Sequence, residues 1–359
     1  MSTSPEKKFG KRFGNLNSFK TSFFENNDGM LRMADGMAEI LSAQPLRKTC
    51  KICGNPLSAE SRPASAGRIP DETLRIKSHG LSYIRCEVCG HLNSEHEDTD
   101  DFANKVYVED DYAKNYSEAD KEQYQKRCEL IYIPKAEFLR DSLNKEGISA
   151  ESADILDIGA GCGYFVTAAR SLGMKAEGIE VSAGEVEYGN KISGSRILTH
   201  VGLTDSIDYI RNTDKNIISA IGVLEHLTHL SENLAAIRNN DNIRYLYASV
   251  PMFSFSCAFE ASHQDCYNRH MGGTHTHLFT NESIACMAES IGFEVAYEWR
   301  FGSDINDLYR FIMVELAKND NKEFADYFAK KFTPLMDELQ LVLDKSEFSS
   351  ENHFILKKT

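Results

Sequence analysis

The chain has 359 residues, a net charge of −14 and a hydrophobic fraction of 42%. This length allows a full α/β domain plus a smaller module, and the negative charge argues against nucleic acid as a main partner, because phosphate binding requires a basic face. No apolar stretch is long enough for a membrane span, and no apolar segment follows the first lysines, so we expect a cytoplasmic protein with nine reduced cysteines.

The N-terminal part, residues 1–45, is polar and is predicted to be a flexible segment. A short amphipathic helix is predicted over Met30–Ser42 within it. Residues 46–95 follow as a separate small module, because two Cys-x-x-Cys-Gly turns stand at its ends.

These turns begin at Cys50 and Cys86 and continue to Cys53 and Cys89, with a loop and a short strand expected between them. Two thiolates at this spacing can chelate one ion, and two such turns complete a tetrahedral four-cysteine zinc site. The alternative, a pair of disulfides, fits poorly with a chain that shows no export signal. The sequence therefore predicts a structural zinc bound by Cys50, Cys53, Cys86 and Cys89, with His91 and His96 as the nearest substitutes.

Residues 96–150 are predicted to form an acidic, tyrosine-rich linker followed by lid helices. The tyrosines Tyr107, Tyr112 and Tyr116 belong either to a solvated connector or to a strap that closes over a substrate. Helical periodicity then runs over Tyr124–Asn144, with a break or kink at Pro134.

A cofactor-binding motif begins where an apolar strand ends in Asp157 and continues into Gly159, Gly161 and Gly163. Such glycines let the backbone turn sharply and let a ligand lie against bare amides at the start of a helix. Glu180 ends the next strand, at the distance expected for a residue that binds a ribose. The sequence therefore predicts an adenosine-containing cofactor.

The spacing of these glycines argues against a dinucleotide, because the sixth position of that fingerprint is not glycine here. The carboxylate of Asp157 would repel a phosphate but suits a ligand that carries an ammonium and a sulfonium group.

The remaining chain alternates strands and helices, which indicates an open parallel sheet with helices on both faces. Seven strands are expected, and residues 304–343 are expected to form a helical insertion near the C-terminal end. Ligands of such sheets lie beyond the carboxyl ends of the strands. The following charged residues fall there: Asp157, Glu180, Asp205, Glu225 and His226.

Four of the eleven histidines lie between Ser262 and His277, in the loop after the fifth strand. His275 and His277 would point the same way in an extended stretch, and His226 follows the fourth strand. Three interpretations remain open for the loop: a general base or substrate ligand, a structural polar network, or a second metal site built from His263, Asp265, His270 and the His275–His277 pair.

Several of these segments together resemble a known family: the paired cysteine turns, the tyrosine-rich linker, the Asp157 glycine loop, Leu224-Glu-His226 and the segment His275–Thr280. They are similar to class I S-adenosylmethionine-dependent methyltransferases with an N-terminal zinc-binding domain, from bacterial polysaccharide and antibiotic-sugar biosynthesis. The resemblance implies a seven-stranded, Rossmann-like methyltransferase sheet over residues 151–359, with a zinc-ribbon module before it and extra helices after it.

For the site, the resemblance implies S-adenosylmethionine as cofactor. It would be bound by these residues: Asp157, Gly159, Gly161, Gly163, Glu180, Asp205 and Glu225. The candidate catalytic residues are His226, His275 and His277.

The acceptor implied by the resemblance is a small molecule, most simply a sugar or nucleotide-linked sugar in polysaccharide or natural-product biosynthesis. An anionic acceptor would be met by Arg269, Arg300 and Arg310. The sugar C-methyltransferases with such a zinc domain carry a further C-terminal α/β domain, for which this chain ends too soon. O-methylation is therefore favoured, with N-methylation as the second choice. The Gly-Val-Leu-Glu-His sequence after the fourth strand also lacks the Asn/Asp-Pro-Pro motif of enzymes that methylate bases or glutamine.

Two alternatives from other classes remain. One is an RNA methyltransferase that binds nucleic acid through the zinc module, and the other is a non-catalytic protein that only binds S-adenosylmethionine.

Overall fold

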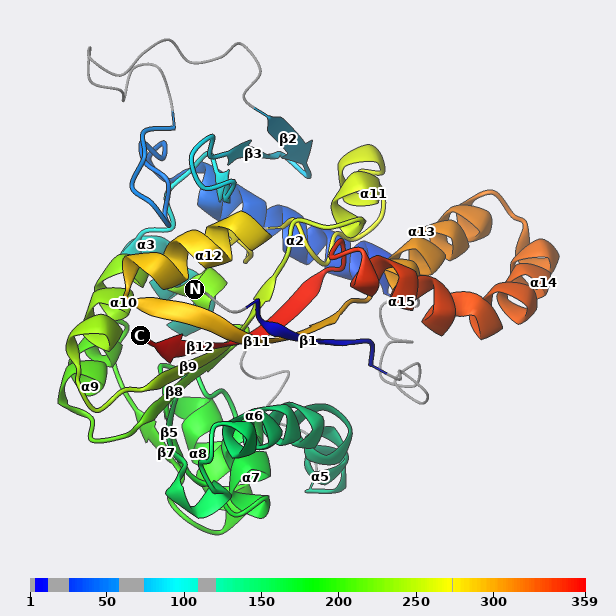
Figure 1. Ribbon diagram of the computed structural model, residues 1–359. Coiled ribbons are helices and arrows are strands. Elements are labelled where there is room, and N and C mark those ends of the chain that lie inside the picture. Colours follow the sequence, from blue (N-terminus) through cyan, green and yellow to red (C-terminus); the bar gives the residue numbers. More distant parts are fainter. Residues whose placement is uncertain (1–3, 12–25, 58–73, 109–120, 273) are drawn as a thin grey trace.

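The computed structural model describes residues 4–11, 26–57, 74–108, 121–272 and 274–359. Its centre is a large twisted sheet with helices on both faces (Figure 1). The strands of this sheet, in chain order, are β1 (Glu6–Phe9), β5 (Asp154–Ile158), β6 (Lys175–Glu180), β7 (Leu198–His200), β8 (Ile217–Ile221), β9 (Tyr245–Pro251), β11 (Phe293–Phe301) and β12 (Glu351–Lys358).

The spatial order of the strands is β1-β11-β12-β9-β8-β5-β6-β7. β7, β6, β5, β8 and β9 run parallel, whereas β12 is antiparallel to both of its neighbours. From β5 the chain adds β6 and then β7 on one side, and it next crosses back to add β8 and then β9 on the other side of β5. The direction in which strands are added therefore reverses between β5 and β8. Such a switch point opens a crevice beyond the carboxyl ends of the two strands.

The predicted strand count was wrong by one, because the sheet contains β1 in addition to the seven expected strands. Glu6–Phe9 pairs in parallel with Tyr297–Arg300 at the edge of the sheet. Residues 1–45 are therefore not flexible throughout: they also contain α2 (Asn27–Ser42), which begins earlier than the predicted helix. β1 is too short for its own pattern to reveal it, and its pairing partner β11 lies near the opposite end of the chain.

Helices cover the two faces of the sheet. On one face α9 (Asp205–Asn212), α10 (Leu230–Asn239) and α12 (Asn281–Ser290) pack against one hydrophobic core. On the other face α6 (Ile133–Lys145), α7 (Tyr164–Ser171) and α8 (Ala183–Ser193) pack against a second. Burial on both faces explains why the central strands read as continuous apolar runs.

Short helical segments precede and connect these elements. They are α3 (Asp100–Ala103), the π-helical η2 (Asn104–Val108), α5 (Lys121–Arg127), the π-helical η4 (Cys128–Tyr132), and the 3₁₀ turns η5 (Ala150–Ser152) and η6 (Leu224–His226). The helix predicted over Tyr124–Asn144 thus contains a π-helical turn just before Pro134, which stands in the first turn of α6. A proline is tolerated there because its missing N–H has no intrahelical acceptor.

A second, antiparallel sheet carries one of the cysteine turns, Cys86–Cys89, between β3 (Leu81–Arg85) and β4 (Leu92–Ser94). Its order is β10-β4-β3-β2, with β2 at Arg75–Ser78. The fourth strand, β10 (His277–Leu278), comes from the loop after β9. The small module is therefore completed by a segment from the C-terminal half of the chain.

One hydrophobic core joins this sheet to the rest of the molecule. Leu41 of α2, Tyr83 of β3, Phe102 of α3 and Met271 of the β9 loop all lie in it and are nearly inaccessible to solvent. The small sheet and the crevice of the large sheet consequently share packing contacts.

The C-terminal insertion forms a helical arm that projects away from the sheet in Figure 1. It consists of α13 (Asp304–Lys318), α14 (Lys322–Phe332), the 3₁₀ turn η7 (Thr333–Leu335) and α15 (Met336–Lys345), while α11 (Ser256–Ser262) follows β9. In the described part of the chain, none of the helices has both the length and the apolar character needed to cross a membrane.

Candidate active site

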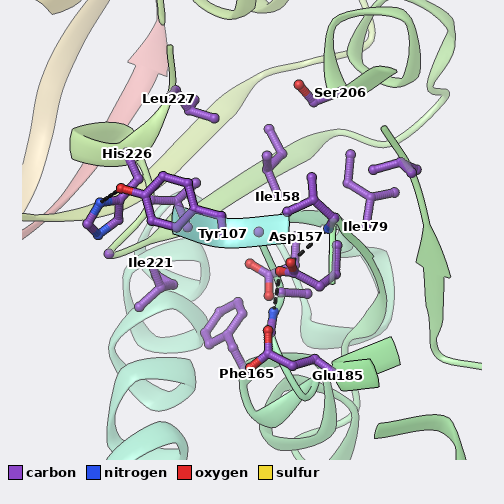
Figure 2. Close-up of a pocket in the computed structure, with 18 of the residues that line it drawn as sticks. Tyr107, Asp157, Ile158, Phe165, Ile179, Glu185, Ser206, Ile221, His226 and Leu227 are labelled. Carbon is purple, nitrogen blue, oxygen red and sulfur yellow. Dashed lines mark hydrogen bonds between the residues drawn. The ribbon is translucent and has the colours of Figure 1, made fainter. Parts of the chain in front are cut away.

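A cavity of about 390 Å³ lies beyond the carboxyl ends of β5, β6 and β8. Figure 2 shows Asp157, Ile158 and Ile179 on one side of it and His226 and Leu227 on another, with Tyr107 across the middle. This volume falls within the range of small-molecule sites, about 300–1,000 Å³. The cavity therefore occupies the place where an open α/β sheet binds its ligand.

The glycine loop forms one wall of the cavity. Gly159, Gly161 and Gly163 all have a positive φ, between 53° and 76°, which side chains with a Cβ rarely adopt. A Cβ on Gly159 would lie 2.7 Å from Cγ2 of Val223, so this position also requires glycine for space. Gly159 and Gly161 line the cavity, whereas Gly163 caps α7 behind it.

Glu180 holds the glycine loop in place. Its Oε2 accepts a hydrogen bond from the Gly161 amide at 2.8 Å, and its Oε1 accepts from the amides of Val181 and Ser182 at 2.7 and 2.9 Å. The Glu180 carboxylate lies at the cavity wall. The two predicted acids, Asp157 and Glu180, are thus brought to one cavity.

Asp157 is almost completely buried and accepts a hydrogen bond of 2.6 Å from the hydroxyl of Ser219. Burial, with a smaller contribution from the nearby charge of Glu180, raises the pKa of Asp157 to about 7. A cation bound in the cavity would favour the ionised form of this carboxyl group.

Glu185 is a third acid of the cavity that the sequence analysis missed. At the start of α8 the Glu185 amide donates to Ser182 Oγ at 3.4 Å. The Glu185 side chain, however, extends to the cavity, where Cys162 Sγ lies 3.7 Å from its Oε1. Burial raises the pKa of Glu185 to about 7.

Two predicted cofactor residues do not line the cavity. Asp205 is at the surface, where its carboxylate accepts from the Gly202 amide at 2.8 Å, and its neighbour Ser206 lines the cavity instead. Glu225 is buried behind the cavity wall, and burial raises the pKa of its carboxyl group to about 8. Both residues do follow a strand, but the direction in which their side chains point does not follow from their place in the sequence.

A polar cluster forms the end of the cavity opposite the glycine loop. The Tyr107 hydroxyl lies 2.9 Å from His226 Nδ1 (Figure 2). Both groups also contact the carbonyl oxygen of Thr274, at 3.2 and 2.9 Å. The ring of His275 lies 5.3 Å from that of His226. Tyr107 thus lines the cavity, while its role as a strap over a substrate stays a prediction; Tyr112 and Tyr116 lie outside the described residues.

His275 and His277 do not point the same way, which corrects the expectation from their spacing. His275 precedes β10, whereas His277 is the first residue of that strand. His275 lines the cavity, whereas His277 is fully buried and its Nδ1 lies 2.8 Å from Nε2 of His91. His277 therefore joins the small sheet to the loop and does not reach the cavity.

The three arginines expected to meet an anionic acceptor are also absent from the cavity lining. Arg269 forms a bidentate ion pair with Asp307, with its shortest contact at 2.7 Å, and Arg310 donates to the Tyr267 carbonyl at 2.6 Å. Arg300 pairs with Glu298 at 2.5 Å. Arg127 of α5, which the sequence did not single out, lines the cavity and lies 5.0 Å from the ring of Tyr164.

The four predicted zinc ligands come together at one point. One sulfur from each of Cys50, Cys53, Cys86 and Cys89 lies within 4.8 Å of the others, and two of the contacts measure 3.5 and 3.6 Å. These spacings are near the roughly 3.8 Å between two sulfurs of a tetrahedral zinc with bonds of about 2.3 Å. All four cysteines are free thiols, which argues against the disulfide alternative. The donor set therefore fits a zinc ion.

Neighbouring groups orient these thiols. Asn93 Nδ2 lies 3.6 Å from Cys50 Sγ, and Asn93 Oδ1 accepts from the Lys51 amide at 2.9 Å. His91 and His96 are directed elsewhere, to His277 and to the Gln44 carbonyl. Such polar support around the ligands is typical of a protein metal site.

Comparison with known proteins bears on the domain that holds the cavity. Residues 124–298 match a family model described as "Methyltransferase domain". This match spans α5 to β11 and includes the glycine loop, Glu180, His226 and His275, but neither Tyr107 nor the cysteine cluster. No curated protein matches the chain.

Solved structures with a similar arrangement include magnesium protoporphyrin IX methyltransferase from Synechocystis with bound S-adenosylhomocysteine (12% identity, TM-score 0.41, covering 66% of this chain and 87% of that one). Another is an S-adenosylmethionine-dependent methyltransferase from Archaeoglobus fulgidus (16% identity, TM-score 0.39, covering 62% and 94%). A third is phosphoethanolamine N-methyltransferase 2 from Haemonchus contortus with S-adenosylmethionine (16% identity, TM-score 0.37, covering 61% and 51%). These scores are too low to carry an argument about the acceptor.

The family match and the cavity agree on the type of domain. The match falls on the residues that form the crevice, and the crevice presents acids and bare amides, with no phosphate-binding glycine spacing. Residues 124–298 form a methyltransferase domain, and the protein is a methyltransferase.

Proposed function

We propose that the protein methylates a hydroxyl group of a small molecule, and that this acceptor is a sugar or a related metabolite. One observation carries the hydroxyl assignment: two imidazoles, those of His226 and His275, line the cavity away from the glycine loop, with their rings 5.3 Å apart. The sugar assignment rests on the resemblance noted in the sequence. We further propose that zinc in the cysteine cluster has a structural role.

The proposed roles follow from the chemistry of methyl transfer. Displacement at a sulfonium needs alignment and exclusion of water, and a hydroxyl acceptor must also lose its proton. Burial lowers the pKa of His226 to about 4 and that of His275 well below its usual value, so both imidazoles are unprotonated at neutral pH. Each can therefore accept a hydrogen bond from an acceptor hydroxyl.

The acidic residues of the cavity are proposed to bind the cofactor. We propose that Glu180 binds the ribose diol, and that Asp157 and Glu185 contribute the negative potential that attracts the cationic methionine part. Arg269, Arg300 and Arg310 give no support to an anionic acceptor, because all three are engaged outside the cavity.

A methylation screen against free and nucleotide-linked sugars tests this proposal most directly. Transfer of a labelled methyl group to a sugar hydroxyl is the expected result. Binding of S-adenosylmethionine without transfer to any small molecule would instead favour the non-catalytic alternative, and transfer to RNA would favour the other.

Replacing His275 by Gln is expected to lower kcat by about 100-fold, the lower end of what a positioned base contributes. The affinity for S-adenosylmethionine should change less than threefold by calorimetry, because His275 stands at the other end of the cavity from the glycine loop. The matched control is His263→Gln, in the same loop but exposed at the surface. Equal losses of turnover and cofactor affinity in His275→Gln would contradict the assignment.

The affinity for S-adenosylmethionine is expected to rise with pH through about 7. In the free protein burial keeps Asp157 partly protonated up to its pKa of about 7, and the cationic ligand binds best to the ionised form.

The raised pKa of Asp157 also affects the stability of the folded protein. A carboxyl whose pKa is higher in the folded state than in the unfolded state makes stability fall as pH rises from about 4 to about 7.

Calorimetric titrations between about pH 6 and pH 8 measure this linkage as a proton released on binding. Asp157→Asn should bind more weakly and with a flatter pH profile; Glu185, with a pKa also about 7, accounts for the slope that remains. Identical profiles in the parent protein and Asp157→Asn would show that another group controls the pH dependence.

A further inference from the structure

Three side chains converge where the cavity meets the loop after β9. Glu225, His226 and His275 each offer one ligand atom, and these atoms lie within 4.8 Å of one another. The Glu225 carboxylate approaches His226 Nε2 to 3.8 Å. Two of the three residues come from η6 and the third from the loop that leads into β10, so only the tertiary fold brings them together.

Both histidines present the nitrogen that a metal ion requires. Nδ1 of His226 lies 2.9 Å from the Thr274 carbonyl oxygen, and Nδ1 of His275 lies 2.8 Å from that of His270. A carbonyl oxygen only accepts, so Nδ1 of His275 carries the proton and Nε2 keeps its lone pair. At His226 the same tautomer follows when the Tyr107 hydroxyl, 2.9 Å from Nδ1, donates to the Thr274 carbonyl and accepts from Nδ1. Metal-bound histidines in proteins show this arrangement: the other ring nitrogen donates to a carbonyl or carboxylate.

Glu225 is the second, independent indication. Its side chain is 3% exposed, and within the described residues its Oε2 has no hydrogen-bond partner. A buried carboxylate oxygen without a donor costs about 1–3 kcal/mol or more, so such groups are rare unless they have a function. Lys135 of α6 contributes positive potential to this carboxyl group, but no hydrogen bond joins the two among the described contacts.

We propose that Glu225, His226 and His275 bind a divalent transition-metal ion, such as Mn²⁺, Fe²⁺ or Zn²⁺, at the acceptor end of the cavity. Two imidazoles and one carboxylate suit these ions and leave coordination positions open. This inference rests on the proposed function, because an open position facing the cavity is where the acceptor hydroxyl would bind.

The ion would act on the acceptor as a Lewis acid. Coordination lowers the pKa of the hydroxyl, and its proton leaves to solvent water. The oxygen then uses a lone pair to form the bond to the methyl carbon while the carbon–sulfur bond breaks. The sulfur keeps that electron pair, and S-adenosylhomocysteine is released with the methyl ether. In this scheme His226 and His275 are metal ligands instead of bases.

The test uses Mn²⁺, which prefers oxygen and nitrogen ligands and so competes poorly for the four thiolates. The full-length protein is first treated with EDTA under conditions that leave the cysteine-bound zinc in place, as checked by metal analysis. Mn²⁺ is then added, and the loss of the free-ion signal is followed by electron paramagnetic resonance. We expect about one Mn²⁺ bound per chain.

Glu225→Gln and His275→Gln should each weaken Mn²⁺ binding at least tenfold, whereas His263→Gln should not. The affinity for S-adenosylmethionine, measured on the same samples, shows that each variant is folded. If the parent protein binds S-adenosylmethionine but no Mn²⁺, or if His263→Gln weakens Mn²⁺ binding as much as His275→Gln, the metal site is refuted.

Turnover separates this inference from the proposed function. With an acceptor in hand, methyl transfer that is abolished by EDTA and restored by Mn²⁺ supports the metal site. Undiminished transfer after EDTA treatment would refute the metal site and leave the proposed function standing, with the histidines as bases.

Discussion

Glu180→Ala is expected to lower the affinity for S-adenosylmethionine by about 100-fold. Two hydrogen bonds from a ribose to a carboxylate contribute about 3 kcal/mol together, and about 1.4 kcal/mol corresponds to a factor of ten. The same carboxylate accepts hydrogen bonds from the amides of Gly161, Val181 and Ser182. Its removal would therefore also remove the hydrogen bonds that hold the glycine loop in place.

The measurement is calorimetric titration with S-adenosylmethionine. Glu177→Ala is the matched control, because Glu177 lies on the same strand, is exposed, and contacts Lys215 at 3.5 Å away from the cavity. Unchanged affinity in Glu180→Ala would show that the pocket assignment is wrong. The affinity of Glu180→Gln should lie between those of the parent protein and Glu180→Ala. The amide of Gln keeps one oxygen that accepts hydrogen bonds, but its NH₂ group is a donor that would face the donor amides of the loop.

The second large effect is expected for the cysteine cluster. Cys50→Ser combined with Cys86→Ser should remove about one zinc per chain and lower the thermal stability strongly. Zinc binding to such sites is worth about 10–16 kcal/mol in small peptides, which is comparable to the whole stability of a domain.

The loss should extend beyond the small sheet. Phe102 and Met271 belong to the hydrophobic core of that sheet. Tyr107 and His275 follow them by a few residues in the sequence and line the cavity. Cofactor affinity should therefore fall in the double variant as well. Cys286→Ser is the control, because Cys286 of α12 packs beside the cluster but is not one of the four grouped sulfurs.

Metal analysis and thermal unfolding give the readouts. Full zinc content in the Cys50/Cys86 double variant would contradict the four-thiolate site, and loss of zinc from Cys286→Ser would mean that the ligand set is wrong.

Local patterns in the sequence were sufficient for much of the fold. Apolar runs ending in glycine or an acid located the central strands, and the alternation with helices indicated the parallel sheet. Positive φ at Gly159 and Gly161 agrees with the sharp turn that the glycine spacing predicted. These features depend on backbone preferences within a few residues, which is the range over which a sequence pattern is informative.

Other features of the site came only from contacts between distant segments. In an extended stretch the side chains of His275 and His277 would point the same way. His277, however, pairs with Asn93 as part of β10, and its side chain lies away from that of His275. Glu185 lies in the first turn of α8, and its side chain lines the cavity. The expected arginines found partners outside the cavity, among them the buried acids Asp307 and Glu298.

The sequence by itself determined which residues end the strands of the sheet, the glycine turn and its two acids, and the paired cysteine turns, because each depends on near neighbours along the chain. The tertiary structure alone decided that β1 extends the sheet, that β10 completes the small one, and that Tyr107, Glu225 and two histidines meet at one end of the cavity. Side-chain direction in loops and the pairing of short strands are set by packing against segments that are distant along the chain, for which a single sequence carries no local signal.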